Sequence, residues 1–423
     1  MKKLTIGILG LGVVGKGVVE LLTKQHALLK QKSGVDLQVV KAFVRNPAEK
    51  AAFAKQYNLQ LTKDPQAVLA DPSIDIIVEV MGKIDPAKDY IATALKNGKH
   101  VVTANKDLLA LHGKELMDLA QEQGRFLYYE ASVAGGIPIL RTLQHAYLAD
   151  DITEIWGIIN GTTNYMLTQM EETDVSYEES LKDAQQKGFA ESDPTNDVDG
   201  FDSGYKTILL AAFAFGTSLE MSDVSIEGIR DIDAEDIQLA KKAGYQVKLI
   251  GRAKKTGNTI SAEVAPMLVP HSHPLAAVRN EYNAVYVKSS GMGNTMYYGA
   301  GAGAGPTATS VLNDLATIAQ NLQTNLPAEP FYKLTEEKWK AGTDSTPARY
   351  YAAFEFSKLS DVSGELQQLL EEAGLFAPGT LLVSSSNTRI ALLTEPIFKE
   401  QLESFTRENP SYPIARIMKI MEE

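Results

Sequence analysis

The amino-acid sequence predicts an α/β protein: a doubly wound parallel sheet, then an α+β domain, and at the C-terminal end a small domain of βαββαβ order. Three observations support this prediction. The chain opens with a short apolar strand that runs directly into a glycine turn and a helix, strands and helices alternate up to residue 103, and the order of elements changes after residue 348. At 423 residues the chain is also too long for one core.

The glycine turn predicts a dinucleotide site. The strand at residues 4–9 is followed at once by the sequence GLGVVG and a helix. Gly10 permits the tight turn, Gly12 lets the backbone approach a pyrophosphate, and Gly15 allows close packing of the helix, whose N-terminus favours an anion. We therefore expect a Rossmann-type domain. Its predicted cofactor contacts in this turn are Gly10, Gly12, Val13, Val14 and Gly15.

The end of the second strand bears on the choice of cofactor. A strand at residues 37–44 is followed by Arg45, at a place where an NAD-specific site usually carries an acid for the ribose hydroxyl. Arg45 can instead meet a 2′-phosphate. We expect NADP(H) as the preferred cofactor, with NAD(H) as the alternative. The other interpretation of Arg45 is an arginine that merely faces solvent.

A strand at residues 100–103 ends where open α/β sheets place their ligands. Thr103 closes this strand, and Lys106 follows at the start of the next helix. We expect both residues beside the nicotinamide end of the cofactor. The alternative for Lys106 is a solvated lysine at a helix start.

An acidic segment stands before an apolar helix in the middle of the chain. Residues 188–206 read GFAESDPTNDVDGFDSGYK and lead into an apolar run at 208–215. Asp202 and Lys206 are spaced i, i+4 and share one helix face, which brings a lysine beside a carboxylate at the start of a buried helix. An ordinary exposed ion pair, with the other acids as a helix cap, is the alternative.

Two further strands are expected in the middle region, at residues 126–133 and 156–165, the second followed by a helix at 166–170. The second strand ends in a polar, glycine-containing turn. Small polar residues at a strand end can hold a small substrate, so Gly161 and Thr163 are candidate substrate contacts. The same residues can instead cap the following helix.

Composition excludes several classes of protein. The net charge of -12 argues against nucleic acid as a partner, because phosphate binding needs a basic surface. The absence of cysteine excludes disulfides and thiolate zinc sites, and the six histidines do not cluster as ligands. No apolar run approaches the ~20 residues of a membrane span. We expect a cytoplasmic protein with no membrane contact.

Seven motifs in order resemble one family. They are GLGVVG, EVMGK, VVTANK, YEASVAGGIP, NGTTNY, GFAESDP and D-x-x-x-K. Together they resemble homoserine dehydrogenase over roughly the first three quarters of the chain. The resemblance implies reversible interconversion of L-homoserine and L-aspartate 4-semialdehyde, in threonine and methionine biosynthesis, by a homodimer. A non-catalytic NADP-binding regulator and a dehydrogenase of another amino-acid semialdehyde are the alternatives.

The resemblance also implies roles for individual residues. Glu191 and Asp202 match substrate-binding positions, Lys206 matches the proposed proton donor, and Lys106 matches a lysine at the cofactor and substrate. A monovalent cation, Na⁺ or K⁺, is implied as well. The positions that match its ligands are Glu130, Val133, Gly135 and Ile137.

The chain departs from the family pattern at three places. Lys83 stands where a second glycine is usual, and the glycine-rich element at residues 301–307 is shorter than usual. That element supplies Gly303 as a further cofactor contact. The third departure is Ser363, which replaces proline in DVSGEL, a sequence that otherwise resembles the signature of an ACT regulatory domain.

The predicted domains follow from these motifs. Residues 1–130 form the dinucleotide-binding domain, completed by about 305–325; residues 131–304 form the dimerisation and substrate domain; 326–347 are a linker; and 348–423 form an ACT-like domain. An ACT-like domain implies regulation by an amino acid such as threonine, and a route to a higher oligomer.

Overall fold

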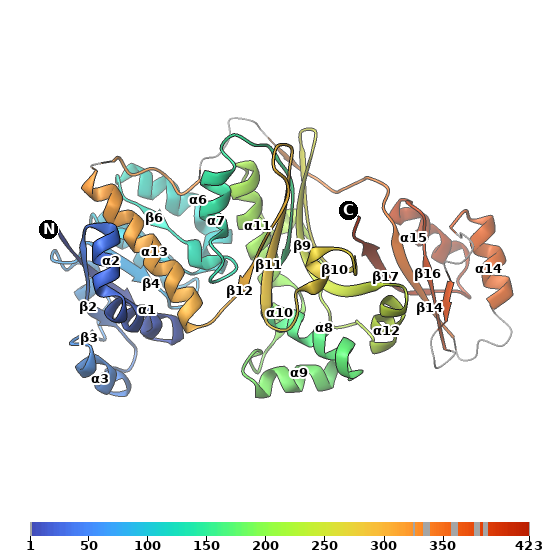
Figure 1. Cartoon of the computed structure of the whole chain (residues 1–423), viewed down its shortest axis with the longest axis horizontal. Helices are drawn as coiled ribbons and strands as arrows, with labels where there is room; N and C mark the ends of the chain where they lie inside the picture. The colour runs from blue at the N-terminus through green and yellow to red at the C-terminus, as the bar shows by residue number, and fades with distance from the viewer. Residues whose placement is uncertain are drawn as a thin grey trace. The chain divides into compact units, whose positions relative to one another are not determined.

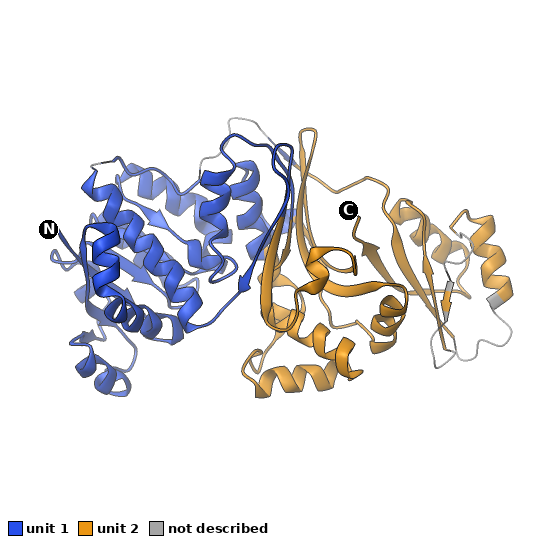
Figure 2. Ribbon diagram, viewed as in Figure 1, with its two compact units in different colours: residues 1–155, 205–223, 287–340 blue, residues 156–204, 224–286, 341–423 orange. Residues whose placement is uncertain are grey.

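The computed structural model describes residues 2–324, 326–332, 339–356, 363–375, 381–383 and 388–422. The chain divides into two compact units (Figure 2). Unit 1 comprises residues 1–155, 205–223 and 287–340, and unit 2 comprises residues 156–204, 224–286 and 341–423. Each unit therefore draws on three separate stretches of chain.

Unit 1 is built on a six-stranded parallel sheet of order β3-β2-β1-β4-β5-β6 (Figure 1). The strands are β1 (Lys3–Leu9), β2 (Asp36–Phe43), β3 (Gln60–Thr62), β4 (Ile76–Glu79), β5 (His100–Thr103) and β6 (Leu127–Tyr128). The central strand β4 is wholly buried and is apolar up to Glu79 at its end, as expected of a parallel strand covered on both faces. This is the strand order of a Rossmann fold, which confirms the predicted fold class.

Helices from distant parts of the chain cover this sheet (Figure 1). They include α1 (Val13–Lys24), α2 (His26–Ser33), α3 (Pro47–Gln56), α4 (Gln66–Leu69), α5 (Ala87–Lys96), α6 (Lys106–Glu122), α7 (Ile139–Ala146) and α13 (Ala304–Gln323). Helix α13 packs against α1, where a Cβ added to Gly17 would lie 2.7 Å from the carbonyl oxygen of Ala304. A late helix thus completes the N-terminal sheet.

The strand predicted at residues 126–133 is wrong in length. Strand β6 covers only Leu127 and Tyr128, and the chain then forms the short 3-10 helix η1 (Glu130–Ser132). The backbone amide of Glu130 donates to Asp314, and Ala134 and Gly135 adopt left-handed φ values of 52° and 50°. The 3-10 helix is incompatible with an extended strand at residues 130–132, and the two left-handed residues lie just beyond the predicted end of the strand.

Unit 2 contains most of a second, mixed sheet, of order β12-β11-β7-β9-β10-β17-β14-β16-β15, with β8 and β13 pairing to β10. Its strands before residue 345 are β7 (Ile152–Ile158), β8 (Val224–Ile226), β9 (Tyr245–Thr256), β10 (Thr259–Pro270), β11 (Tyr282–Ser289), β12 (Gly293–Ala300) and β13 (Lys340–Ala341). The helices are α8 (Gly161–Thr173), α9 (Tyr177–Gln186), α10 (Thr195–Val198) and α12 (Ala234–Lys242), while α11 (Phe201–Phe215) starts in unit 2 and continues in unit 1.

The strand predicted at residues 156–165 is also wrong at its end. Strand β7 stops at Ile158, and the polar turn forms the first turn of α8. The side chain of Asn160 accepts from the backbone amide of Thr163 at 2.8 Å and so caps this helix. N-cap chemistry therefore decides the conformation, because asparagine at this position favours a helix start over a continued strand.

The C-terminal part of unit 2 has the predicted βαββαβ order. Its elements are β14 (Tyr350–Glu355), α14 (Ser363–Glu372), β15 (Leu381–Val383), β16 (Arg389–Leu393), α15 (Lys399–Glu408) and β17 (Ile414–Ile420). Strand β14 pairs antiparallel with β16 and β17, in the manner of a split βαβ fold. Residues 361 and 362 of the DVSGEL sequence lie outside the described residues. Strand β17 also pairs in parallel with β10.

Candidate active site

The glycine turn after β1 has the geometry that its sequence predicts. Gly10 has a φ of 101°, which only glycine adopts readily, and a Cβ added to Gly15 would lie 2.1 Å from the carbonyl oxygen of Gly10. Gly12, the N-cap of α1, is different: among the described residues no heavy atom lies within 4 Å of where its Cβ would be. The turn is therefore closely packed at Gly10 and Gly15, and it is open at Gly12, where an anion would approach.

The remaining predicted cofactor contacts lie at the ends of other elements of unit 1. Val13 is 69% exposed at the start of α1, Arg45 is exposed after β2, and Gly303 is the N-cap of α13 with a φ of 116°. In the glycine-rich loop before α13, the carbonyl oxygen of Gly301 would lie 2.3 Å from a Cβ on Gly135. The loop is short, and glycine permits its close contact.

A buried hydrogen-bond network holds the loop that carries Lys106. Glu79, at the end of β4, is fully buried, and its carboxylate accepts from the Thr103 hydroxyl at 2.6 Å and the Met81 amide at 2.7 Å. Burial raises the pKa of Glu79. The side-chain oxygen of Asn105 accepts from the Leu108 amide in the first turn of α6, and its side-chain nitrogen donates to the Lys83 carbonyl. These hydrogen bonds fix the loop that precedes Lys106, which is the first residue of α6.

The two predicted catalytic lysines both belong to unit 1. The Nζ of Lys106 lies 3.3 Å from Asp107, and Lys106 is about one-third exposed. Lys206 lies half-buried in α11, next to Tyr205. Burial raises the pKa of the Tyr205 hydroxyl, Asp107 raises it further, and Lys106 lowers it, so α11 and the start of α6 interact electrostatically.

Unit 2 supplies a polar cluster at the start of α8. The side-chain nitrogen of Asn160 donates to Asp197 at 2.7 Å and to Asp202 at 2.8 Å. Asn160 and Asp202 are both buried. The Thr162 hydroxyl donates to the Phe189 carbonyl at 2.6 Å and approaches Asp197 at 3.3 Å. One amide therefore fixes two carboxylates that lie 37 and 42 positions away from it in the sequence.

Two of the other predicted substrate contacts, Gly161 and Thr163, lie beside this cluster in the first turn of α8. Thr163 is buried in the first turn of α8, and a Cβ added to Gly161 would lie 2.9 Å from the carbonyl oxygen of Glu281. Glu191 is exposed, and its carbonyl accepts from Gln185. Asp202 and Lys206 are one turn apart in α11, as the i, i+4 spacing predicts.

The predicted cation ligands lie on one loop of unit 1. The carboxylate of Glu130 accepts from the backbone amides of Leu140 at 2.8 Å and Arg141 at 2.9 Å, at the start of α7. Burial, and then Asp314, raise the pKa of Glu130, while Arg141 lowers it. The carbonyl of Gly135 accepts from the Ser310 hydroxyl, and that of Ile137 from the Ile139 amide. Each of these oxygens keeps a second lone pair, so the donor set suits a hard cation.

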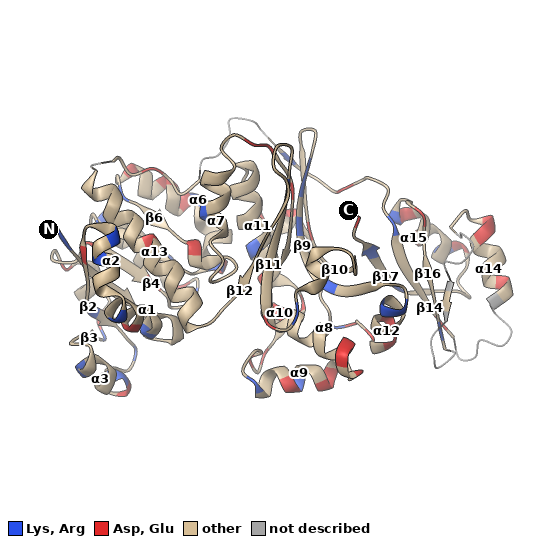
Figure 3. Cartoon of the chain, viewed as in Figure 1, with Lys and Arg blue, Asp and Glu red and all other residues tan. Residues whose placement is uncertain are grey.

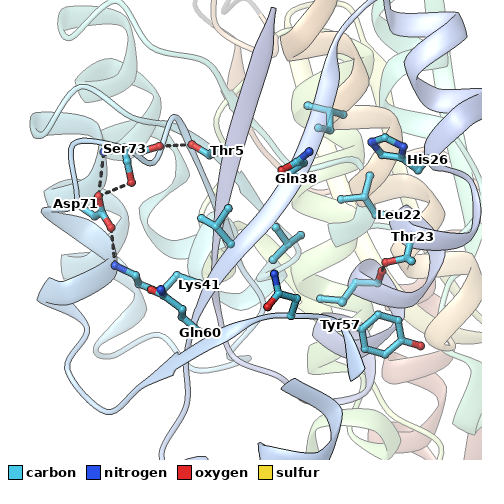
Figure 4. Close-up of a pocket in the computed structure, with 15 residues that line it drawn as sticks. Thr5, Leu22, Thr23, His26, Gln38, Lys41, Tyr57, Gln60, Asp71 and Ser73 are labelled. Atoms are coloured by element: carbon cyan, nitrogen blue, oxygen red, sulfur yellow. Dashed lines mark hydrogen bonds and ion pairs between the residues drawn. The ribbon is translucent and has the colours of Figure 1, made fainter. Parts of the chain in front are cut away.

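One cavity, of about 650 Å³, lies elsewhere in unit 1 (Figure 4). It borders residues 37–41 of β2. Lys41, Asp71 and Ser73 form a hydrogen-bonded chain on one side, and His26 pairs with Asp36 on the other. The residues that line it include none of the predicted site residues, all of which the structure describes. We do not assign the active site to this cavity.

Sequence reasoning missed three residues of these networks: Glu79, Asn160 and Asp197. Two of them carry a recognisable signal. Glu79 interrupts the apolar strand Ile76–Glu79 at its carboxyl end, and Asn160 precedes a helix as a preferred N-cap residue. Asp197 carries none, because it is one of several acids in its segment and only its contact with Asn160 distinguishes it.

The fold and these residues define the class of protein. A Rossmann sheet with an open glycine turn, and a lysine at the start of the helix that follows β5, characterise an NAD(P)-dependent oxidoreductase. Charges of both signs are interspersed along the elements (Figure 3). Among the residues that the structure describes, no helix combines the length and apolar character needed to cross a membrane.

Comparison with known families gives the particular activity. Residues 10–130 match the family model "Homoserine dehydrogenase, NAD binding domain", and residues 138–316 match "Homoserine dehydrogenase". The homoserine dehydrogenase of Bacillus subtilis is 45% identical over 338 residues, 80% of this chain and 78% of the relative. That of Lactococcus lactis is 44% identical over 367 residues, 86% of this chain and 85% of the relative. The chain belongs to the homoserine dehydrogenase family.

Two solved structures match the whole length of the chain, and a third matches part of it. The homoserine dehydrogenase of Thiobacillus denitrificans has a TM-score of 0.91 at 33% identity, covering 100% of this chain and 99% of that one. A homoserine dehydrogenase of S. aureus has a TM-score of 0.82 at 33% identity, with both chains covered fully. A hyperthermophilic archaeal homoserine dehydrogenase, solved with NADPH, has a TM-score of 0.65 at 26% identity and covers 77% of this chain.

Proposed function

We propose that Lys206 acts as the proton donor and acceptor in the interconversion of L-homoserine and L-aspartate 4-semialdehyde. The nicotinamide, when bound, supplies or takes the hydride at the substrate's carbonyl carbon. In the reducing direction the Lys206 ammonium gives a proton to the carbonyl oxygen, and in the other direction the neutral amine takes it back. The observation that carries the proposal is the placement of Lys206 one turn after the buried Asp202 in α11.

The other proposed roles follow from the two polar networks. Asp202 and Glu191 hold the amino group of the substrate by charge, while Gly161 and Thr163 line the same turn. Lys106 orients the reacting end, because the Glu79, Thr103 and Asn105 network fixes its position. An assay of NADPH oxidation with L-aspartate 4-semialdehyde tests the activity. Turnover of a different semialdehyde at a higher kcat/KM would favour another substrate, and no turnover at all would favour a regulator.

We propose NADP(H) as the preferred cofactor. Arg45 is exposed directly after β2, at the position where an acid would select the ribose hydroxyl of NAD. The archaeal relative that was solved with NADPH is consistent with this choice. Comparing kcat/KM for the two cofactors tests the preference.

We propose that Glu130, with the carbonyls of Val133, Gly135 and Ile137, holds a monovalent cation. A single carboxylate and several carbonyl oxygens suit such an ion better than a divalent transition metal. Consistent with this, no three His, Cys, Asp or Glu side chains gather as a metal site in the described part of the chain. Replacing choline by potassium at constant ionic strength should raise the melting temperature of the wild type and leave that of Glu130→Gln unchanged.

We propose that residues 348–423 form an ACT-like regulatory domain of a cytoplasmic homodimer. The strand order β17-β14-β16-β15 and its apolar core support a separate folding unit. Deleting these residues should leave measurable activity, since every proposed catalytic residue precedes them. It should also lower stability, because Lys419 pairs with Glu263 at 2.9 Å and β17 pairs with β10. Inhibition curves with L-threonine and light scattering of both proteins test regulation and assembly.

A further inference from the structure

We propose that residues 226–232, here called the bridging segment, position the acidic substrate segment, residues 191–202, and that Arg416 of the C-terminal domain braces the bridging segment from its other side. The proposal rests on the proposed role of Asp202 and its neighbours in substrate binding. It adds positioning residues, above all Gly228 and Arg230, which lie outside the polar cluster itself.

The closest contact is between backbones. The amide of Ile229 donates to the carbonyl of Val198 at 2.7 Å. A Cβ added to Gly228 would lie 2.2 Å from that same carbonyl oxygen and 2.5 Å from the Cα of Asp199. These distances are far below van der Waals contact, so only glycine allows the two segments to meet at this point. The backbone of Val198 and Asp199 is therefore located by the bridging segment.

A side-chain contact also fixes the orientation of the turn at Asp199. The guanidinium of Arg230 makes two hydrogen bonds to the carboxylate of Asp199 and approaches the Thr195 hydroxyl at 3.2 Å. Arg230 is 44% exposed, and an exposed ion pair alone contributes little to stability. Its planar fork nevertheless fixes the orientation of the turn that carries Asp199.

The located turn belongs to the polar cluster. Val198 ends the single-turn helix α10 (Thr195–Val198), which includes Asp197. Asp197 accepts from the same Asn160 amide that holds Asp202. A shift of Val198 and Asp199 therefore moves Asp197 and changes the orientation of Asn160. Because the Asn160 amide also donates to Asp202, the same shift changes the position of the buried Asp202 carboxylate.

The bridging segment is itself held by strand β10 and by the C-terminal domain. The Glu227 amide donates to the Val264 carbonyl at 2.7 Å, which continues the parallel pairing of β8 with β10. Ile229 is fully buried. Arg416, from β17, bonds to the Glu227 carboxylate at 3.1 Å and donates to the Asp231 carbonyl. The C-terminal domain thus contacts the same segment that locates the substrate turn.

The neighbouring helix α12 is tied to the C-terminal domain in the same way. Tyr351 donates to Asp236 at 2.6 Å, and Arg389 lies 3.0 Å from the same carboxylate. Asp236 is buried, so these partners hold it firmly. Arg416 is consequently one of several braces, and its removal should have a smaller effect than a change at Gly228.

Steady-state kinetics of Gly228→Ala, Arg230→Ala and Arg416→Ala tests the proposal. We expect the KM for homoserine to rise about tenfold for the first two variants and about threefold for the third, with the KM for NADP within about twofold. Arg230→Lys should recover only part of the loss, because lysine lacks the fork. Arg407→Ala is the matched control, since Arg407 lies on α15 and bonds to Ser404 of its own helix.

The outcomes separate this proposal from the proposed function. If Asp202→Asn raises the KM for homoserine and none of the three variants does, the positioning role is refuted while the substrate role stands. If Asp202→Asn has no effect on that KM, the substrate role itself fails. Equal rises in both KM values would also refute positioning, because they indicate general loss of structure. Should Gly228→Ala not fold, the arginine variants decide alone by the same criteria.

Discussion

In unit 1 the glycine turn of the proposed cofactor site lies within residues 10–15, whereas the polar cluster of unit 2 joins Asn160 to carboxylates 37 and 42 positions away in the chain. The first arrangement is set by local conformation: a positive φ at Gly10 and a close approach at Gly15. The second depends on the packing of three separate segments. Local sites tolerate change elsewhere in the fold, and assembled sites do not, so the two regions should respond differently to mutation.

The difference extends to the way each region is supported. Lys106 is held by a buried network within two adjacent strand ends, through Glu79 and Thr103. The acidic segment is instead held from outside, by the bridging segment and, behind it, by the C-terminal domain. Cofactor binding should therefore be insensitive to the C-terminal domain, while substrate binding depends on it.

The largest expected effect is at the residue proposed for proton transfer. Lys206→Ala should lower kcat by roughly 10²- to 10⁴-fold, the usual contribution of a general acid, with the affinity for NADPH nearly unchanged. Rapid-mixing measurements of NADPH binding and turnover check both parts. Lys114→Ala, at an exposed pair on α6, is a control for lost charge. Near-normal turnover of the Lys206 variant would show that another group moves the proton.

The next effect contrasts the two regions directly. Gly15→Ala should raise the KM for NADP about tenfold or more, because the new Cβ meets the Gly10 carbonyl and displaces α1. The KM for homoserine should stay within about twofold. Gly113→Ala is the control, since its Cβ would have its nearest neighbour 3.8 Å away. A variant that raised both KM values equally would remove the distinction between local and assembled sites.

Asn160→Asp should give the opposite pattern. Aspartate keeps the acceptor that caps α8 but loses the amide donor shared by Asp197 and Asp202, and it places a third negative charge beside them. We expect the KM for homoserine to rise by about tenfold to a hundredfold, with the KM for NADP within about twofold. Melting temperature, measured in parallel, shows whether the cap is kept. Unchanged substrate binding would mean that the amide only caps the helix.

The extent to which the sequence predicts the structure follows the same division. The Rossmann sheet and the βαββαβ order were predictable, since glycine turns and alternating apolar runs are local signals. The strand at 126–133 failed because residues 130–132 form a 3-10 helix, in which the Glu130 amide donates to the distant Asp314, and no local signal in the sequence indicates that contact. The contact of Gly228 with Val198 was not predictable for a related reason. The two residues are distant in the chain, and the local sequence around each contains no signal of their contact.

A smaller effect is expected for the choice of cofactor. Arg45→Asp should lower the ratio of kcat/KM for NADPH over NADH by about tenfold to a hundredfold, because a phosphate partner is replaced by an acceptor for the ribose hydroxyl. Lys55→Asp, an equal charge change in α3 at an exposed position, is the control. If both variants shifted the ratio equally, general electrostatics rather than a specific contact would explain the preference. An unchanged ratio would mean that Arg45 only faces solvent.

The smallest effect concerns stability, and it compares one buried basic group from each unit. In unit 1, the ring of His100 accepts from the Phe126 amide at 3.0 Å, and burial, with Arg125 nearby, lowers the pKa of His100 to about 4. In unit 2, Lys248 donates to Asn164 and to the Val278 carbonyl, and burial lowers the pKa of Lys248 to about 8. In both cases the native state binds the proton less tightly than the unfolded chain.

The sign of the pH dependence is the same for the two groups, but the windows differ. The free energy of unfolding should fall as the pH falls from about 6.5 to about 4, because the histidine is protonated in the unfolded chain before it is protonated in the native state. It should rise as the pH rises from about 8 to about 10.5, because the lysine loses its proton in the native state before it does so in the unfolded chain. Each contribution is at most about 3 kcal/mol. Denaturant unfolding of the wild type, His100→Asn and Lys248→Met from pH 5 to pH 10 measures both. The asparagine variant should flatten only the acidic limb and the methionine variant only the alkaline limb; flattening of both limbs by either variant would show that the two units do not titrate independently.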